Sequence, residues 1–158
     1  MKTDLSYTKV LLLGYTGYIG TMLAEVLLEK GIEVICPIRN KKNFEKKRNI
    51  VFVDISQIES FLKSLSIKPT TIISCIASRK GGIKDSWEVE YSLNKFFLDL
   101  SKREGIKRFI LLSAICVQKP NLEFQKAKLA FENLLKNSTV EYEIIRPTAF
   151  FKSLSGQI

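Results

Sequence analysis

Three glycines stand at a spacing that suits the binding of a phosphate-rich ligand. Gly14, Gly17 and Gly20 follow the apolar run Lys9–Leu13, and the chain continues as Tyr18–Lys30 with helical character. In a strand–turn–helix unit, the first glycine permits a tight turn, the second lets the backbone approach a pyrophosphate, and the third allows close packing of helix and strand. The N–H groups and positive dipole of the helix N-terminus face the phosphates. The pattern predicts a dinucleotide site; the alternative is a glycine-rich turn without a ligand.

The spacing of these glycines is G-x-x-G-x-x-G rather than the G-x-G-x-x-G of many dehydrogenases. It resembles the spacing in the extended and atypical short-chain dehydrogenase/reductases, a resemblance shared by many different chemistries. We expect the whole turn to hold the dinucleotide, through Gly14, Tyr15, Thr16, Gly17, Tyr18, Ile19 and Gly20.

The residue at the end of the second expected strand indicates which dinucleotide is bound. An NAD site usually has Asp or Glu about 20 residues past the glycines, where it accepts a hydrogen bond from the ribose 2′-hydroxyl. Here that place holds Arg39, with Lys41 and Lys42 behind it. A guanidinium can bind a 2′-phosphate through two hydrogen bonds, whereas a carboxylate would repel it. We therefore expect NADPH as the cofactor; the alternative for Arg39 is a solvated loop cation.

Two further strand ends are expected to contact the dinucleotide. Asp54 and Ile55 follow the third strand, in the turn that reaches the adenine in this kind of fold. Asp54 and Ser56 are equally natural caps for the helix that follows. At the end of the fourth strand, the small residues Ala77 and Ser78 leave room for the nicotinamide ribose.

The fifth strand leads to the residues that would do chemistry. Classical short-chain reductases place a serine at its end and a Tyr-x-x-x-Lys on the next helix. Here Ser113 ends the strand, where we expect it to contact the cofactor. Phe124 stands at the tyrosine position and Lys128 at the lysine position. Phenylalanine has no proton to give, so the usual acid for ketone reduction is absent. Lys128 is the candidate catalytic residue, either holding the nicotinamide ribose or assisting a proton transfer; the alternative is a surface cation like Lys126.

These positions require a particular set of elements, and the pattern of the chain supplies them. Short apolar runs alternate with helical stretches, which predicts a Rossmann-type α/β fold with a doubly wound parallel sheet of strand order 3-2-1-4-5-6. The expected strands are Val10–Leu13, Glu33–Cys36, Ile50–Val53, Thr71–Cys75, Arg108–Leu112 and Tyr142–Ile145. The expected helices are Tyr18–Lys30, Ser56–Leu65, Trp87–Arg103 and Leu122–Asn137.

Composition narrows the class of protein. The chain has 158 residues, of which 46% are hydrophobic and 26% charged, as in one ordinary globular domain. It contains no histidine, which removes Ser-His-Asp catalysis and histidine-ligated zinc, and we expect no metal site. No apolar run approaches the roughly 20 residues that span a bilayer. The first residues show no signal-peptide pattern, so the chain as given is expected to be cytosolic or already without a targeting segment.

The cysteines and the net charge bear on the redox state and the partners. Cys36, Cys75 and Cys116 are odd in number, lie beside apolar runs and are expected to be reduced, buried thiols; a reactive Cys116 is the alternative. The net charge of +9 is densest at residues 39–48. No aromatic residues alternate with the basic ones in the manner of a nucleic-acid surface, so we expect no nucleic-acid partner.

The end of the chain suggests an incomplete reductase. After Arg146-Pro147-Thr148 come Phe150 and Phe151, and the sequence stops at Ile158. Reductases of this type add a substrate-covering region after this point. We therefore expect residues 1–158 to form one NAD(P)-binding Rossmann domain whose substrate region is missing or is supplied by a partner chain.

Three long strings resemble one particular family. Cys75–Trp87, Leu112–Pro120 continuing through Leu122–Leu129, and Ile145–Leu154 resemble the divinyl chlorophyllide a 8-vinyl reductases, over nearly the whole chain. The resemblance implies an NADPH-dependent atypical short-chain reductase that reduces the 8-vinyl group of a tetrapyrrole to ethyl. The phenylalanine at the tyrosine position belongs to that family's pattern as well. Members of the family continue well beyond Ile158.

The resemblance also implies a setting in chlorophyll biosynthesis. We expect the cytoplasm of a photosynthetic bacterium, or a plastid if the transit peptide of a nuclear-encoded protein is absent. The basic surface suits a pigment that bears a carboxylate, and peripheral contact with an anionic membrane. A non-catalytic accessory subunit or an NADP(H) sensor of the same fold remains the alternative.

Overall fold

The computed structural model describes residues 8–39, 49–79 and 82–148, which form a six-stranded parallel sheet. The strands are β1 (Lys9–Leu13), β2 (Glu33–Ile38), β3 (Ile50–Asp54), β4 (Thr71–Ser74), β5 (Arg108–Leu112) and β6 (Glu141–Ile145). Their order is β3-β2-β1-β4-β5-β6, which confirms the predicted doubly wound topology. Leu11 of β1 pairs with Ile35 of β2 on one side and with Ile72 of β4 on the other. The continuous burial of β1 and β2 follows from this central position, because helices cover both faces.

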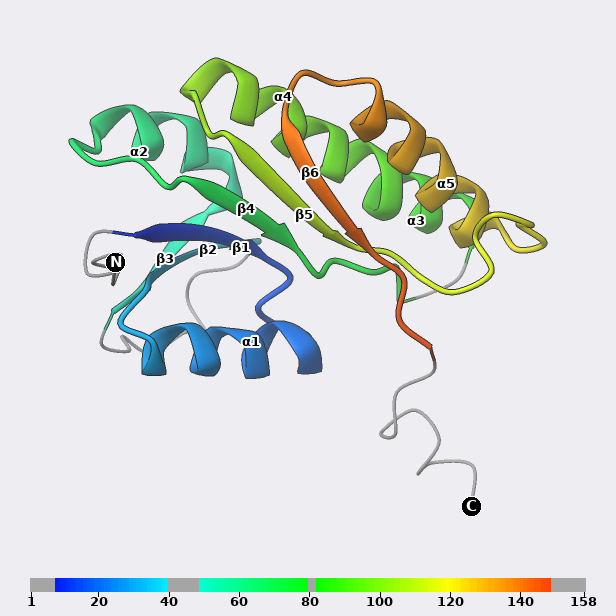
Figure 1. Cartoon of the computed structure of the whole chain (residues 1–158), viewed down its shortest axis with the longest axis horizontal. Coiled ribbons are helices and arrows are strands. Elements are labelled where there is room, and N and C mark those ends of the chain that lie inside the picture. The colour runs from blue at the N-terminus through cyan, green and yellow to red at the C-terminus, as the bar shows by residue number, and fades with distance from the viewer. Residues whose placement is uncertain (1–7, 40–48, 80–81, 149–158) are drawn as a thin grey trace.

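The helices lie in two layers. They are α1 (Tyr18–Glu29), the 3-10 helix η3 (Ile55–Gln57), α2 (Ile58–Ser64), α3 (Ile83–Ser86), the π-helix η4 (Trp87–Leu93), α4 (Asn94–Glu104) and α5 (Glu123–Lys136). In Figure 1, α1 lies below the sheet, and α2, α4 and α5 lie above it. None of the helices in the described residues is long and apolar enough to cross a membrane.

Each layer closes its own part of the core. Below the sheet, Ala24 and Leu27 of α1 pack against Leu12 and Val34. Above it, Phe97 of α4 and Phe131 of α5 belong to a larger cluster of buried residues that is built on the other faces of the same strands. Phe131 lies 5.6 Å from Phe109 of β5 between ring centroids. The sheet therefore has a fixed register, and its strands deliver their carboxyl ends to one edge of the molecule.

Two expected helices differ from the structure. The helix expected from Trp87 begins at Ile83 instead, and its middle is the π-helix η4. Polar residues at 84–86 hide the start because they break the apolar period, and a π-turn leaves no mark in the composition. The helix expected at Ser56–Leu65 is divided into η3 and α2. Gly105, with a φ of 72°, ends α4 in the left-handed conformation that glycine adopts readily.

The prediction of buried cysteines holds only in part. All three lie in the described residues and are free thiols, but only Cys36 is buried; Cys75 is half-buried and Cys116 is exposed. It has a φ of 65° in the turn after β5, so the chain leaves the sheet before this residue and its side chain faces solvent. Burial raises the pKa of Cys36 to about 12. Burial also raises the pKa of Cys75 to about 11, although the charge of Lys128 opposes the increase.

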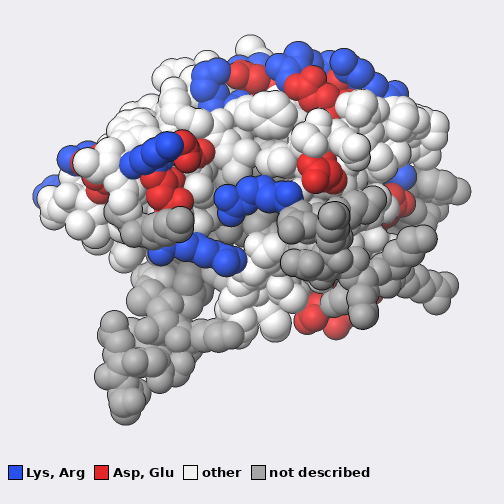
Figure 2. Space-filling model, turned by 180° about the vertical axis from the view of Figure 1, so that it is seen from behind, with Lys and Arg blue, Asp and Glu red and all other residues white. Residues whose placement is uncertain are grey.

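The surface over the helices carries both signs of charge. Lys95 and Asp99 of α4 form an ion pair at 2.6 Å, and Arg103 pairs with Glu59 of α2 at the same distance. Figure 2 shows basic and acidic side chains interspersed along the upper part of the molecule. The net positive charge therefore does not form a field of one sign on that part of the surface.

Candidate functional site

The glycine turn joins β1 to α1 at the carboxyl edge of the sheet, between β2 and β4. Gly14 has a φ of 88°, and its carbonyl accepts a hydrogen bond of 3.0 Å from the N–H of Gly17. A Cβ at Gly14 would lie 2.7 Å from the carbonyl carbon and oxygen of Cys75, which follows β4. A side chain has no room at that distance, so the turn requires glycine for both its conformation and its packing.

The other two glycines differ in what the protein itself demands of them. A Cβ at Gly20 would lie 2.1 Å from the carbonyl oxygen of Gly14, so α1 can approach the turn only with glycine there. A Cβ at Gly17 would lie 3.4 Å from that same oxygen, an ordinary contact. A turn without a ligand would explain Gly14 and Gly20 but would not require Gly17. The space above Gly17 suits a pyrophosphate, which needs the backbone without a side chain.

The N-terminus of α1 has the properties of an anion site. Gly17 is its N-cap, and among the described residues no side chain caps it and no acidic residue stands in its first turn. Thr21 stabilises the turn differently, because its hydroxyl donates to the carbonyl oxygens of Tyr15 and Gly17 at 2.8 and 3.0 Å. The ring of Tyr15 packs against Phe52. Tyr15 therefore contributes its backbone to the turn. The N-terminal N–H groups of the helix and its positive dipole end are the features that bind a phosphate.

The remaining residues of the turn are accessible. Thr16 and Tyr18 are exposed, and Ile19 is half-buried. Arg39 directly follows β2 and is exposed, and among the described residues none forms an ion pair or hydrogen bond with it. Lys41 and Lys42 lie outside the described residues. The contact of Arg39 with a 2′-phosphate stays a prediction.

Asp54 has the capping role that the sequence left open. Its carboxylate accepts hydrogen bonds from the N–H and the hydroxyl of Ser56, at 2.9 and 2.6 Å, and so caps η3. Ile55 is half-buried behind it. The contact of Asp54 and Ile55 with adenine stays a prediction.

The loop after β4 is hydrogen-bonded to a buried acid that was not predicted from the sequence. Ala77 is exposed, while Ser78 donates to Glu90 of η4 through both its N–H and its hydroxyl, at 2.8 and 3.1 Å. Glu90 is 1% exposed. Next to it, Asn94 donates to the carbonyl of Glu90 and accepts a hydrogen bond from Ser74 at the end of β4.

Lys128 is bound to this acid and is not a surface cation. Its Nζ lies 2.7 Å from Oε2 of Glu90, and its side chain is only 7% exposed. The neighbouring Lys126 is exposed and pairs with Glu123, as a surface lysine does. The contact between Lys128 and Glu90 is an ion pair outside hydrogen-bond geometry, so Oε2 has no hydrogen-bond donor among the described residues.

One sequence signal for Glu90 was present. The buried residues of the helix run from 83 to 104 include Ser86, Glu90, Asn94, Phe97 and Ser101, at steps of four or three. This inward stripe is polar from Ser86 to Asn94 and apolar at Phe97 and Leu98, and Glu104 near its C-terminal end is buried as well. The four-residue spacing of Ser86, Glu90 and Asn94 was the sequence signal that places the three on one helix face.

Ser113 is also engaged with a buried acid, Glu132, which lies one turn after Lys128 in α5. Its hydroxyl donates to Oε1 of Glu132 at 2.6 Å, and Ser113 is 5% exposed. Arg146, just after β6, donates to both carboxylate oxygens of Glu132. Burial alone would raise the pKa of Glu132, but the hydrogen bonds from Arg146 and Ser113 and the nearby charges lower it. Ser113 thus ties β5 to α5, and its contact with a cofactor stays a prediction.

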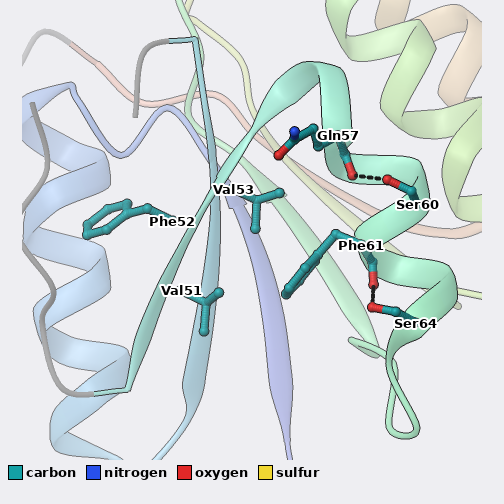
Figure 3. A pocket seen from close by; sticks show the side chains of 7 residues that line it. All are labelled: Val51, Phe52, Val53, Gln57, Ser60, Phe61 and Ser64. Carbon is teal, nitrogen blue, oxygen red and sulfur yellow. Dashed lines mark hydrogen bonds between the residues drawn. The ribbon is translucent and has the colours of Figure 1, made fainter. Parts of the chain in front are cut away.

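A separate pocket of about 370 Å³ lies between β3 and α2. Figure 3 shows its lining: Val51, Phe52, Val53, Gln57, Ser60, Phe61 and Ser64. The hydroxyl of Ser60 donates to the carbonyl oxygen of Gln57 at 2.9 Å, and that of Ser64 donates to the carbonyl oxygen of Phe61 at 2.7 Å. None of the predicted cofactor residues lines this pocket, and those hydroxyls are already engaged.

The sheet order and the glycine turn define a nucleotide-binding domain of the Rossmann class. Within that class, the chain belongs to the NAD(P)H-binding family, whose model matches residues 14–157. The fold is similar to that of the enzyme WbmG of Bordetella bronchiseptica, crystallised in complex with NAD. The TM-score is 0.76 at 18% identity, and the match covers 92% of this chain and 55% of that one. At this identity the similarity concerns the fold.

Two relatives are closer in sequence. The chain is 42% identical over 170 residues to the chloroplastic divinyl chlorophyllide a 8-vinyl-reductase of Arabidopsis thaliana, covering 94% of this chain and 41% of that protein. It is 31% identical over 153 residues to the photosystem II assembly factor Ycf39 of Cyanophora paradoxa, covering 94% of this chain and 47% of that protein. The first match confirms the resemblance predicted from the three strings. The chain spans less than half the length of either relative.

Proposed function

We propose that residues 1–158 form the NADPH-binding domain of a reductase that converts the 8-vinyl group of a divinyl chlorophyllide to ethyl. The observation that carries the proposal is the 42% identity to a divinyl chlorophyllide a 8-vinyl-reductase along 94% of the chain. Membership of the NAD(P)H-binding family and the space above Gly17 support a nicotinamide dinucleotide in the glycine turn. Because the chain spans 41% of that relative, the rest of the substrate site belongs to a further region or partner chain.

The site suits alkene reduction better than ketone reduction. A bound NADPH supplies a hydride, and the protein supplies position, charge and exclusion of water. Reduction of a vinyl group conjugated to a macrocycle spreads the negative charge over the ring, so no oxyanion forms at a single carbonyl. A tyrosine acid is then not essential, which is consistent with Phe124 at that position. Alignment of the two reactants accounts for much of the rate.

Lys128 is the residue that we assign to the chemistry. Its ammonium lies at the carboxyl ends of the strands and is held by the buried Glu90. There it either binds the nicotinamide ribose or delivers a proton to the reduced pigment. The two roles separate in kinetics: loss of ribose binding weakens NADPH affinity, and loss of proton delivery lowers turnover alone.

The preference for NADPH over NADH rests on Arg39. Arg39→Asp should lower NADPH affinity by about 1.5–3 kcal/mol, the range for hydrogen bonds to charged groups. NADH affinity should be unchanged or higher. Fluorescence titration with both cofactors measures this, with Arg103→Asp on the exposed surface of α4 as the control. Equal affinity of the wild-type chain for NADPH and NADH would contradict the assignment of Arg39 to the 2′-phosphate.

The reaction itself is tested with two chains. We expect the 158-residue chain to bind NADPH without turning over divinyl chlorophyllide. The same chain joined to the remaining region of the Arabidopsis relative should remove the divinyl absorption signature in the presence of NADPH. Full turnover by the short chain would show that its substrate site is complete. Binding of NADPH without turnover in the joined chain would favour a non-catalytic role.

A non-catalytic, NADP(H)-binding accessory protein is the second candidate. The 31% identity to a photosystem II assembly factor and the absence of a tyrosine at residue 124 favour it. Pigment analysis of a strain that lacks the gene separates the two functions. Divinyl pigment should accumulate if the chain belongs to the reductase, and monovinyl pigment should persist if it belongs to an accessory protein.

The cellular setting follows from the same relatives. We propose a plastid, because the name of the Arabidopsis reductase places that protein in the chloroplast. The cytoplasm of a photosynthetic bacterium is the corresponding site for a bacterial source. Peripheral contact with an anionic membrane is consistent with the net charge of +9.

A further inference from the structure

Arg79 is a basic residue at the dinucleotide turn to which neither sequence nor family assigns a role. It follows β4, on the strand adjacent to β1, and is exposed. Its guanidinium Nη2 lies 3.3 Å from the carbonyl oxygen and 3.5 Å from the hydroxyl of Thr16, which is 63 residues away in the chain. The side chain thus extends from the β4 loop onto the glycine turn.

The backbone below Arg79 is held in place by two acids. The N–H of Arg79 donates to Asp85 at 3.1 Å, and the N–H of Ser78 donates to the buried Glu90 at 2.8 Å. Two successive backbone groups are therefore fixed to the helix run that begins at Ile83. The direction of the Arg79 side chain toward the glycine turn follows from this anchoring.

The charge of Arg79 is not neutralised by the described residues. Arg103, Arg108 and Arg146 each form an ion pair with a glutamate. Arg79 forms none within the described part of the chain, and its guanidinium contacts only uncharged oxygens of Thr16. Such contacts are weaker than a bidentate pair with an oxyanion, which a guanidinium is shaped to make.

We propose that Arg79 is a ligand of the dinucleotide pyrophosphate and exchanges its contacts with Thr16 for phosphate oxygens. This inference rests on the proposed dinucleotide site. The pyrophosphate at the N-terminus of α1 would then be bound from two sides, by backbone N–H groups from the turn and by the guanidinium from the β4 loop. The two arginines should therefore affect the cofactors differently. Arg79 should matter for NADPH and NADH alike, because both have a pyrophosphate, whereas Arg39 should matter for NADPH alone, because only NADPH has the 2′-phosphate.

The test compares arginine variants by titration with NADPH and with NADH. Arg79→Gln should weaken both cofactors by the same factor, on the order of 10- to 100-fold. Arg79→Lys keeps the charge but loses the bidentate geometry, and should fall between wild type and Arg79→Gln. Arg39→Gln should weaken NADPH alone. Arg103→Gln, which removes an exposed arginine paired with Glu59, is the matched control and should change neither affinity.

The free energy of unfolding without cofactor, measured in urea, separates binding from folding. The proposal predicts that Arg79→Gln and Arg103→Gln differ little in stability. Three results would overturn it: wild-type affinity of Arg79→Gln for both cofactors, a loss confined to NADPH, or a loss matched by equal destabilisation of the free chain. If Arg79→Gln behaves like wild type while wild type binds NADPH, this inference alone fails. A wild-type chain that binds neither cofactor would overturn the proposed dinucleotide site as well.

Discussion

The two halves of the sheet build their parts of the site from different materials. In the half formed by β1, β2, β3 and α1, the glycine turn is built from backbone: Gly14 and Gly20 allow the close approach, and the N-terminus of α1 has no side-chain cap. In the half formed by β4, β5, β6 and the helices above them, it consists of buried charged side chains. Glu90 meets Lys128 there, and Glu132 meets Arg146.

This difference determines how each half tolerates change. A backbone cradle fails when atoms are added, because a new Cβ collides with a carbonyl. A buried ion pair fails when atoms are removed, because the partner left behind is a charge without compensation. The first half should therefore be sensitive to enlargement of glycines, and the second to truncation of charged residues.

The largest expected change in stability is in the second half. Lys128→Met would leave Glu90 charged and 1% exposed, and should lower the free energy of unfolding by about 3–5 kcal/mol, as measured by urea denaturation. Adding Glu90→Gln should restore much of the loss, because the amide oxygen still accepts from Ser78 and no charge remains. Lys126→Met, at the exposed neighbour, should change stability by less than about 0.5 kcal/mol. If Lys128→Met is as stable as Lys126→Met, the ion pair between Lys128 and Glu90 does not stabilise the fold.

The sequence predicted the first half more completely than the second. The strand order and the roles of Gly14 and Gly20 were legible because conformational limits select glycine at fixed positions. Glu90 was missed because its partners are Ser78 and Lys128, which only the folded chain brings together. A glutamate in a helix resembles a surface residue until the neighbouring helix is placed.

The role of Lys128 was left open for the same reason, because its partner is known only in the folded chain. Its sequence position suggested a catalytic lysine or a surface cation, and spacing could not choose between them. Burial against Glu90 excludes the surface cation. Conversely, the exposure of Cys116 could not be read from its apolar neighbours, because a turn with a positive φ begins there.

In the first half, the largest effect should come from Gly20→Ala. The added Cβ would lie 2.1 Å from the carbonyl oxygen of Gly14, so α1 must shift. Overpacking of this kind costs about 1–3 kcal/mol in unfolding free energy, and the displaced turn should also weaken NADPH binding. Gly17→Ala is the matched control for stability, since its Cβ would make an ordinary contact at 3.4 Å. Equal stability of the two variants in urea would contradict the tight packing at Gly20.

Gly17→Val sharpens the comparison by separating binding from folding. Gly17 has φ and ψ of −89° and 161°, an extended conformation that valine adopts readily. Because valine is a poorer N-cap than glycine, stability should fall modestly, by about 1 kcal/mol, and the chain should remain folded. NADPH binding should be lost, because the side chain fills the space predicted for the pyrophosphate. Unchanged affinity in a folded Gly17→Val chain, measured by fluorescence titration, would show that the turn does not hold the cofactor.

The smallest expected effect is a pH-dependent one at Glu132. Lys136, which is partly exposed, lies 3.5 Å from the carboxylate, so Lys136→Met should cost about 0.2–1 kcal/mol at neutral pH. The folded pKa of Glu132 is below its unfolded value. Its stabilisation is therefore complete above the unfolded pKa of about 4.3 and is lost as the pH falls through the lower, folded pKa.

The contribution of Lys136 requires the charged form of Glu132. The difference in unfolding free energy between wild type and Lys136→Met should therefore be constant near neutral pH and should vanish at acidic pH. Urea denaturation at a series of pH values measures this difference. Lys63→Met is the control, because the exposed Lys63 forms no ion pair with any described residue, and its difference from wild type should not depend on pH. If the difference in unfolding free energy persists at a pH where Glu132 is protonated, Lys136 acts through packing. The half of the sheet formed by β4, β5 and β6 would then depend less on buried charge than its contacts indicate.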